Sequence, residues 1–266
     1  MNTDPSSDHE TEGIVAIKMA VVRENARFFI AEIESSLPSL SPDDAAAGLE
    51  KLSEYHRIAA IAGFLTTLDR AVFREDLKQS AQSRLRQLQL LPAEAAGYFQ
   101  RASRIEPFCD ALAAREDELA ERIAALSPAQ VLEGEEFEEN HCYARVLLAL
   151  LALEPSPRAD EAQNLDRALS ALETALDGNL PRRLAACQAL AQRDADAFHT
   201  ALLDLIEERD LHIQKRKRTL VPDMEREATE AAIYIEGMAL LRLAARIGIN
   251  SDESYRFIPD LVRPDR

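Results

Sequence analysis

Residues 228–259 carry the apolar pattern around which we expect the rest of the chain to be organised. The central part of this stretch has only three charged positions, which are Glu236, Arg242 and Arg246. Its apolar residues fall on more than one side of a helix with 3.6 residues per turn: Ile233, Ile235, Met238, Leu240, Leu241, Leu243 and Ile247. A helix that is apolar almost all round has to be buried. We therefore predict a buried central helix here.

This central helix has a recognisable start and end. Pro222 suits the first turn of a helix, so the helix is expected to begin there and to run to Ile247. Gly248 follows the last periodic residue, where a left-handed residue ends many helices, and Ile249 is placed to fold back onto the last turn.

Apolar residues also recur every three or four positions through the first half of the chain, which predicts further amphipathic helices. The predicted segments are 14–33, a stretch from Ser41 to about Leu90, 92–103 and 107–125. The second of these is long enough to be one helix or two, with a break near Gly63 or Arg74. Its expected core residues are Leu49, Leu52, Ile58, Ile61, Leu65, Leu68, Val72 and Leu77. Ser127 and Pro128 have the form of another helix start.

The second half of the chain is predicted to consist of paired helices at 158–176, at 181–192 and from Asp194 to about Lys215. The third of these has four inward-facing residues: Phe198, Leu202, Leu205 and Ile206. No fixed repeat length is present, so we assign no helical-repeat family. The expected fold is all-α, a multi-helix bundle of antiparallel helix pairs with repeat-like stacking as an option for the C-terminal half.

An acidic stretch at the start of the chain and a proline-containing segment near its middle suggest how the chain is divided. Residues 1–12 are polar and acidic and are predicted to be a disordered tail. The sequence Glu-Pro-Ser-Pro at 154–157 separates an N-terminal helical part, 13–154, from a C-terminal one, 155–266. We expect the two parts to form one compact domain.

The net charge limits the kinds of partner, and the cysteines indicate the compartment. The formal charge of −16 opposes binding to nucleic acid or anionic membrane, and it favours basic protein partners or serves solubility alone. The longest apolar run, 146–153, is far shorter than the ~20 residues that cross a bilayer. Cys109, Cys142 and Cys187 are few and widely spaced, which is typical of reduced thiols in a cytoplasmic protein. The oligomeric state is left open.

Catalytic and metal-binding motifs are not evident. The sequence lacks the spacings of a P-loop, a G-x-S-x-G elbow and an H-E-x-x-H zinc site. The adjacent pair His141 and Cys142 is too small a set for zinc, which takes three or four ligands. Glu208 and His212 are four residues apart, whereas the di-metal bundle motif spaces them by three. We therefore expect no enzyme activity, no metal and no cofactor.

Two acidic clusters are the most distinctive polar features. Residues 133–139 read EGEEFEE, and a second cluster lies on the predicted helix before His212. Both are candidate docking surfaces for a basic protein, and both are also compatible with simple solvation: Glu133, Glu135, Glu136, Glu138, Glu139, Asp204, Glu207, Glu208 and Asp210. Residues 215–218 (KRKR) are either an internal counter-charge or cations at a helix end. Glu236, inside the buried helix, is expected to pair with an arginine from another helix.

Three stretches carry a family resemblance: ALAQRDADAFHTALLDLIEERDLHI (189–213), IYIEGMALLRLAARIGI (233–249) and YRFIPDLV (255–262). Across about 140–262, the order of a small-residue helix, a short Asp turn, a Phe-containing helix, a buried helix with a glycine end and a terminal Ile-Pro segment resembles the immunity protein 49 family of bacterial polymorphic toxin systems. The resemblance implies an all-α protein, made beside a secreted toxin domain, that binds and neutralises it. It implies no cofactor and no catalytic residues. Many such toxins act on nucleic acid and are basic, so an acidic inhibitor would be drawn to them.

Three functions therefore stay open at this stage. The first is an immunity protein that blocks its cognate toxin by direct binding, and the second is a helical-repeat adaptor or chaperone with a concave groove for a peptide or a secreted effector. The third is an enzyme or metal protein built into a helical bundle.

Overall fold

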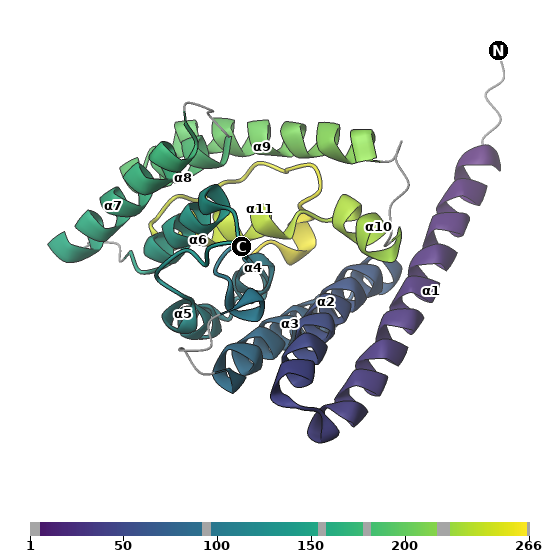
Figure 1. Cartoon of the computed structure of the whole chain (residues 1–266). Helices are drawn as coiled ribbons and strands as arrows, with labels where there is room; N and C mark the ends of the chain where they lie inside the picture. The colour runs from purple at the N-terminus through teal and green to yellow at the C-terminus, as the bar shows by residue number, and fades with distance from the viewer. Residues whose placement is uncertain (1–5, 92–96, 154–157, 178–181, 217–223, 265–266) are drawn as a thin grey trace, which may run out of the picture.

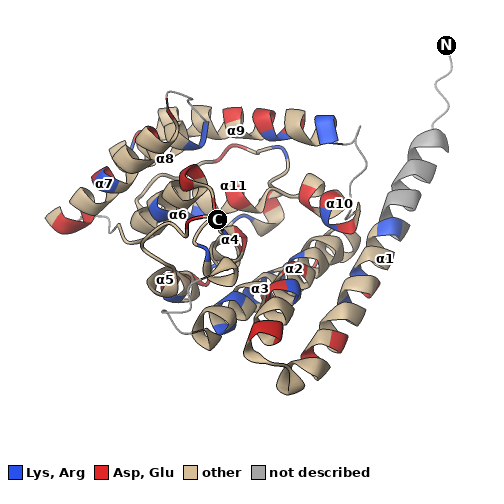
Figure 2. Cartoon of the chain, in the orientation of Figure 1, with Lys and Arg blue, Asp and Glu red and all other residues tan. Residues whose placement is uncertain are grey.

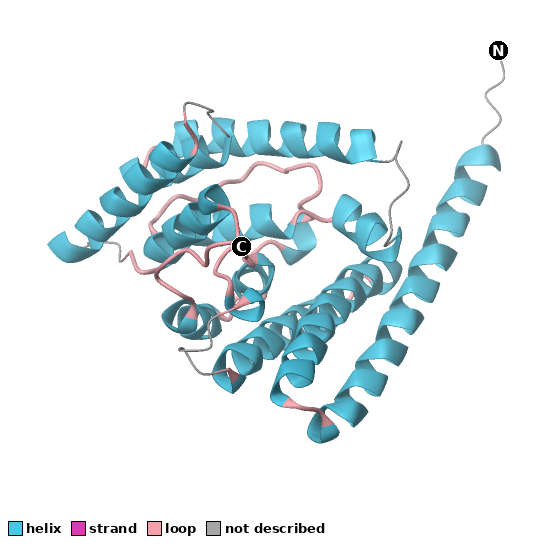
Figure 3. Ribbon diagram, in the orientation of Figure 1, coloured by secondary structure: helices cyan, strands magenta, loops and turns pink. Residues whose placement is uncertain are grey.

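The computed structural model describes residues 6–91, 97–153, 158–177, 182–216 and 224–264. Within these ranges the chain is helical, without any strand, and the all-α prediction is confirmed (Figure 3). The first helices are α1 (Ser6–Ser36), α2 (Pro42–Thr67), α3 (Arg70–Leu90), α4 (Glu106–Ala113), α5 (Asp117–Leu126) and α6 (Glu138–Leu151). The later ones are α7 (Ala159–Ala175), α8 (Arg182–Gln192), α9 (Ala195–Arg216), α10 (Met224–Ala232) and α11 (Ile235–Arg246). Short 3-10 turns occur at η1 (Leu37–Ser39), η3 (Tyr98–Gln100) and η4 (Asp260–Val262).

The helices form two groups around a central one. Figure 1 shows α1, α2 and α3 side by side at one end of the molecule, and α7, α8 and α9 along the opposite edge. Between them lie α4, α6 and α11, with the C-terminal segment passing beneath α9. The main core cluster draws on helices from α2 to α11, whereas a smaller cluster lies between α1 and α2 alone.

The central helix is buried as its pattern predicts. In α11 the buried residues lie on every side of the helix: Ile235, Gly237, Met238, Ala239, Leu240, Leu241, Leu243 and Ala244. The helix end is also confirmed, because Gly248 has φ of 90° and the N–H of Ile249 donates to the carbonyl oxygen of Ala244 at 2.9 Å. Ile249 is itself buried.

The length of that helix is different from the prediction. Instead of one helix from Pro222, α10 ends at Ala232 and α11 begins at Ile235. The N–H of Tyr234 donates to the carbonyl oxygen of Phe257 at 2.8 Å, so a residue of the C-terminal segment takes the place of a helical partner. Arg209 donates to the carbonyl oxygens of Glu230 and Ile233, which the break leaves without helical donors. Pro222 lies outside the described residues.

The close approach of the C-terminal segment makes Gly237 a sensitive position. A Cβ added there would lie 2.5 Å from Tyr234 Cδ1 and 2.8 Å from Ile258 Cδ1. Gly237→Ala is therefore expected to lower the free energy of unfolding by about 1–3 kcal/mol through overpacking, measured by urea denaturation. Gly63→Ala is the matched control, because the new Cβ would meet only the flexible side chain of Arg23 at 3.4 Å. The control should be neutral or gain up to about 1 kcal/mol from helix propensity. Equal losses at both glycines would contradict this explanation.

The long segment after Ser41 is two helices, α2 and α3, which pack against each other. The break falls between the two predicted positions, at Leu68 and Asp69. Leu68 has a left-handed φ of 56°, and the Asp69 carboxylate accepts from the N–H groups of Ala71 and Val72 at 2.9 and 3.1 Å. The expected core residues Leu65 and Leu68 are exposed, because the helix turns away from the core there.

The region between α3 and α6 is less helical than predicted. In place of a helix at 92–103, the described part has only the turn η3, and residues 92–96 lie outside the described residues. The helix predicted at 107–125 is divided at Arg115, where φ is 67°, into α4 and α5. Ser127 does not start a helix; it ends α5, with its hydroxyl donating to the carbonyl oxygen of Ile123 at 2.8 Å.

The second half agrees with its predicted helices. α7, α8 and α9 match the expected segments, and Asp194 accepts from the N–H of Ala197 at 3.0 Å at the start of α9. The four inward-facing residues predicted on α9 are all buried. Residues 154–157, the predicted division, lie outside the described residues, as do residues 1–5 of the acidic tail. α1 begins at Ser6, within the segment predicted to be disordered.

Two further properties of the described residues concern membrane-spanning helices and the cysteine thiols. Among the described helices, none combines the length and the apolar character needed to cross a membrane. Cys109, Cys142 and Cys187 are free and buried, and burial raises the pKa of each thiol, to about 12 for Cys187. Protonated, buried thiols are poor nucleophiles.

Candidate functional site

The segment 132–139, which we call the acidic loop, is the end of the connection between α5 and α6 together with the first two residues of α6. Four of its carboxylates, Glu133, Glu135, Glu138 and Glu139, are exposed, and within the described part of the chain none of them forms an ion pair. The last two lie in the first turn of α6, where the helix dipole favours negative charge. The acidic loop therefore presents uncompensated carboxylates to solvent.

The fifth carboxylate, Glu136, has a different role from the one predicted. Its side chain is 0% exposed and accepts from the N–H groups of Ser103 at 2.8 Å and Leu132 at 3.1 Å. The Nδ1 atom of His141 lies 2.9 Å from the same carboxylate. Burial alone would raise the pKa of Glu136, but these hydrogen bonds hold it below its usual value. Glu136 fixes the loop against the body of the protein and is not available to a partner.

Phe137 is the one aromatic residue in the acidic loop, and its side chain is 72% exposed. Its backbone is fixed, because its carbonyl oxygen accepts from the N–H groups of Asn140 and His141 at 3.1 and 3.0 Å as α6 begins. An exposed aromatic ring on a fixed backbone, with carboxylates on both sides, matches the anatomy of a protein-binding surface with an aromatic anchor and a charged rim.

Removing the charge of Glu136 should loosen the acidic loop. Glu136→Gln is expected to lower the free energy of unfolding by about 1–3 kcal/mol at neutral pH, because buried donors lose a charged acceptor. Since the folded state holds this pKa below its usual value, the contribution is present above the unfolded pKa and is lost as the pH falls through the folded pKa. The difference between wild type and variant should therefore shrink in acid, as measured by urea denaturation at several pH values. Glu135→Gln, an exposed neighbour, should stay within about 0.5 kcal/mol, and an equal effect of both changes would contradict the anchoring role.

The second predicted cluster lies on α9, where Figure 2 shows acidic positions in red. Ion pairs partly neutralise it. Arg182 lies 3.4, 3.8 and 3.9 Å from the carboxylates of Asp204, Glu207 and Glu208. Asp210 pairs with Arg256 at 2.5 Å. We call these four carboxylates the α9 patch. Because arginines already share its charge, it offers a weaker attraction to a cation than the acidic loop.

The basic run after α9 is only partly described. Lys215 and Arg216 lie in the last turn of α9, where cations interact favourably with the helix dipole, and Arg216 also pairs with Glu227 of α10. Residues 217 and 218 lie outside the described residues.

Glu236 is paired with an arginine from another helix, as the sequence predicts. Arg183 of α8 donates to both of its carboxylate oxygens, at 2.8 and 2.7 Å, and the Tyr143 hydroxyl of α6 donates at 2.7 Å. The Arg183 guanidinium also lies over the Tyr143 ring, 4.6 Å from its centroid. Burial and the neighbouring Glu236 raise the pKa of Tyr143 well above its usual value, so the phenol stays protonated at neutral pH and donates a hydrogen bond to the carboxylate. Arg183 and Glu236 also line a groove of about 490 Å³ between α8, α9, α10 and α11, together with Glu208, Arg209 and His212.

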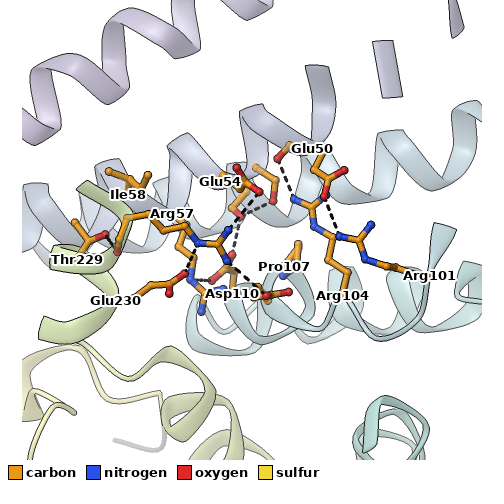
Figure 4. A pocket seen from close by; sticks show the side chains of 14 residues that line it. Glu50, Glu54, Arg57, Ile58, Arg101, Arg104, Pro107, Asp110, Thr229 and Glu230 are labelled. Atoms are coloured by element: carbon orange, nitrogen blue, oxygen red, sulfur yellow. Dashed lines mark hydrogen bonds and ion pairs between the residues drawn. The ribbon is translucent and has the colours of Figure 1, made fainter. Parts of the chain in front are cut away.

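A second charged cluster surrounds a cavity of about 60 Å³ between α2, α4 and α10, shown in Figure 4. Arg104 pairs with Glu50 at 2.8 Å, and Arg226 pairs with Glu230 at 2.8 Å, so most of the charges in its wall are compensated. Burial raises the pKa of Asp110 to about 6, even with Arg57 3.5 Å away. The cavity has room for a few water molecules, and it is lined by residues such as Arg57, Glu106 and Asp110, each of which has a buried polar atom without a hydrogen bond among the described residues. We interpret it as a polar, water-sized space left where α10 packs against α2 and α4.

Among the described residues, no three His, Cys, Asp or Glu side chains lie close enough together to bind a metal ion. His141 faces Glu136, and His199 lies 2.5 Å from the Tyr255 hydroxyl, so both have structural partners.

The sequence predicts the acidic run as a docking surface but does not predict a role for Phe137 within it. The signal was present, because a single aromatic residue among five acids at a helix start has no apolar neighbours in the chain to pack on. A large apolar residue in such a position is either covered by a distant segment or left exposed for a partner.

Comparison with known proteins gives a family. The model described as Immunity protein 49 matches residues 65–261, well over half of the chain and more than the 140–262 of the sequence resemblance. The match includes the acidic loop, the α9 patch and α11. No curated protein and no solved structure matches the chain.

Proposed function

The chain belongs to the immunity protein 49 family, and on that premise we propose that it neutralises a cognate secreted toxin by binding it directly. The inhibition is non-covalent and requires no catalysis by the chain. The observation that carries this proposal is the acidic loop, a fixed surface whose four exposed carboxylates have no ion-pair partner among the described residues. The proposed partner is a basic toxin, such as one that degrades nucleic acid.

The charge of the chain supports a basic partner. With a formal net charge of −16, the protein attracts cationic proteins over a distance and speeds their encounter. Charge alone does not give tight binding, which needs about 1,600 Å² of buried interface and a few well-packed anchors. Phe137 supplies an anchor at the centre of the acidic loop.

We propose the acidic loop as the main contact and the α9 patch as a secondary one. In this scheme Glu133, Glu135, Glu138 and Glu139 form the rim, and Glu136 positions the loop from inside. The α9 patch contributes less because Arg182 and Arg256 already pair with its carboxylates.

The alternative of a helical-repeat adaptor has less support. Stacked repeats would give helix pairs of similar length, whereas the described helices range from 8 to 31 residues.

The three free, buried cysteines fit the reducing cytoplasm, which we propose as the site of action.

The test is to mix the purified protein with the toxin made beside it and to analyse the mixture by size exclusion at low salt. We expect a stable complex and loss of toxin activity at equimolar inhibitor. Absence of a complex would contradict direct binding. So would full inhibition of the toxin by much less than one equivalent of the protein.

A further inference from the structure

A groove of about 580 Å³ lies between α5, α6 and α7. Most of the described side chains that line it are apolar, and nearly all of these are alanines: Ala124, Ala125, Leu148, Ala149, Ala152 and Ala168. Because alanine side chains are short, a segment bound in the groove would come close to the backbone of α6. An open apolar groove of this kind suits the apolar side of a segment from a protein partner.

Two arginines that line this groove have no counter-charge. Arg145 of α6 and Arg167 of α7 form no ion pair with a carboxylate in the described part of the chain. Glu161, the one carboxylate among the described lining residues, already pairs with Arg158 at 2.6 Å. The chain has 47 acidic residues, yet it leaves these two guanidinium groups open to a carboxylate from outside.

The groove and the acidic loop meet on one face of α6. Glu138 of the acidic loop is followed at intervals of seven, four and three residues by three residues that line the groove: Arg145, Ala149 and Ala152. This spacing places all four on one side of a helix, and all four keep exposed surface. At about 1.5 Å of rise per residue they span about 21 Å. A single protein interface of ordinary size covers that length.

We propose that the toxin binds along this open face of α6 and places an apolar segment flanked by acidic residues in the groove. The inference rests on the proposed function, because it names a further contact made by the same toxin. The basic surface of the toxin then faces the acidic loop, and its acidic segment faces Arg145 and Arg167. Because the two ends of the face carry opposite charges, only one orientation of the toxin satisfies both.

The experiment is titration calorimetry of the purified full chain with the toxin domain made beside it. Arg145→Glu and Arg167→Glu should each raise the dissociation constant about tenfold, because repulsion replaces a charge-assisted contact. Each change makes the chain more negative by two charges, which by itself strengthens the attraction to a basic toxin. A loss of affinity would therefore come from the groove and not from the net charge.

Arg86→Glu is the matched control, because Arg86 is exposed on α3, does not line this groove and has no ion pair among the described residues. It should leave the dissociation constant unchanged or lower it slightly. Ala152→Leu tests the groove by filling it, and it should raise the dissociation constant about tenfold. Since Ala152 is exposed, this variant should keep the stability of the wild type. Circular dichroism and urea denaturation check that each variant is folded.

The outcomes separate this inference from the proposed function. If the wild type binds and both arginine variants bind as Arg86→Glu does, the groove is not a contact, and the proposed function stands without it. If the wild type forms no complex, the proposed function fails and this inference fails with it. A free protein that dimerises in sedimentation equilibrium, and loses the dimer on Arg145→Glu, would assign the groove to a second copy and overturn the proposal.

Discussion

Replacing Phe137 with alanine is expected to weaken the complex with the toxin about 30-fold, which corresponds to about 2 kcal/mol. The ring is the largest apolar group on the acidic loop, and burying it against a partner would remove its exposed surface from water. Its exposure in the free protein means that the free energy of unfolding should change by less than about 0.5 kcal/mol. The measurement is titration calorimetry with the purified toxin.

The control for this prediction is Met224→Ala. Met224 is 78% exposed at the start of α10, outside both proposed contacts, and its loss should leave the affinity unchanged. If Phe137→Ala binds the toxin as tightly as the wild type does, the acidic loop is not the anchor of the complex.

The charged rim should affect the rate of association more than the lifetime of the complex. Changing Glu133, Glu135, Glu138 and Glu139 together to glutamine is expected to slow association about tenfold at low salt and to flatten its salt dependence. The corresponding changes of Asp204, Glu207 and Glu208 should have a smaller effect, because Arg182 lies close to all three. Stopped-flow mixing at several salt concentrations compares the two, and the reverse order would make the α9 patch the main contact.

The largest effect on stability is expected at Arg183. Arg183→Ala leaves the mostly buried Glu236 without its counter-charge, and such losses cost about 3–5 kcal/mol in protein interiors. Arg183 is itself 39% exposed, so water softens the loss and about 3 kcal/mol is expected. Since 1 kcal/mol shifts Tm by about 2–4 °C in a chain of this size, Tm should fall by about 6–12 °C.

The neighbouring residue provides the control. Arg182 lies at the surface, where it donates to the carbonyl oxygen of Asp204 at 2.8 Å and lies 3.4 Å or more from the nearest carboxylate, so Arg182→Ala should change the free energy of unfolding by less than about 1 kcal/mol. Adding Glu236→Gln to Arg183→Ala should recover part of the loss, because it removes the unpaired charge. Equal effects of the two arginine changes, or no recovery in the double variant, would show that the pair does not hold α8 to α11.

The sequence predicted those features that depend on neighbours along the chain. The burial of α11 followed from apolar residues on all its sides, and its end followed from the left-handed residue Gly248. The pairing of Glu236 with an arginine was predictable in kind, since a buried carboxylate needs a counter-charge. The identity of Arg183 was not, because it comes from a helix more than fifty residues away.

Features that depend on distant segments were missed for the same reason. The break between α10 and α11 arises because the N–H of Tyr234 donates to the carbonyl oxygen of Phe257 and not to a helical partner. No pattern in the neighbouring sequence predicts this break. Among the acids of the acidic loop, Glu136 alone is buried, because the N–H of Ser103 lies within its reach. Leu68 continues the apolar period of α2 but falls on the turn, where the helix no longer faces the core.

The central claim is that the acidic loop is the surface that holds the toxin, and hydrogen–deuterium exchange of the free and toxin-bound protein tests it most directly. We predict that binding slows exchange of the backbone amides of residues 132–139, with a smaller change along α9 and none in α1. Unchanged exchange in the acidic loop of a fully formed complex would contradict the account.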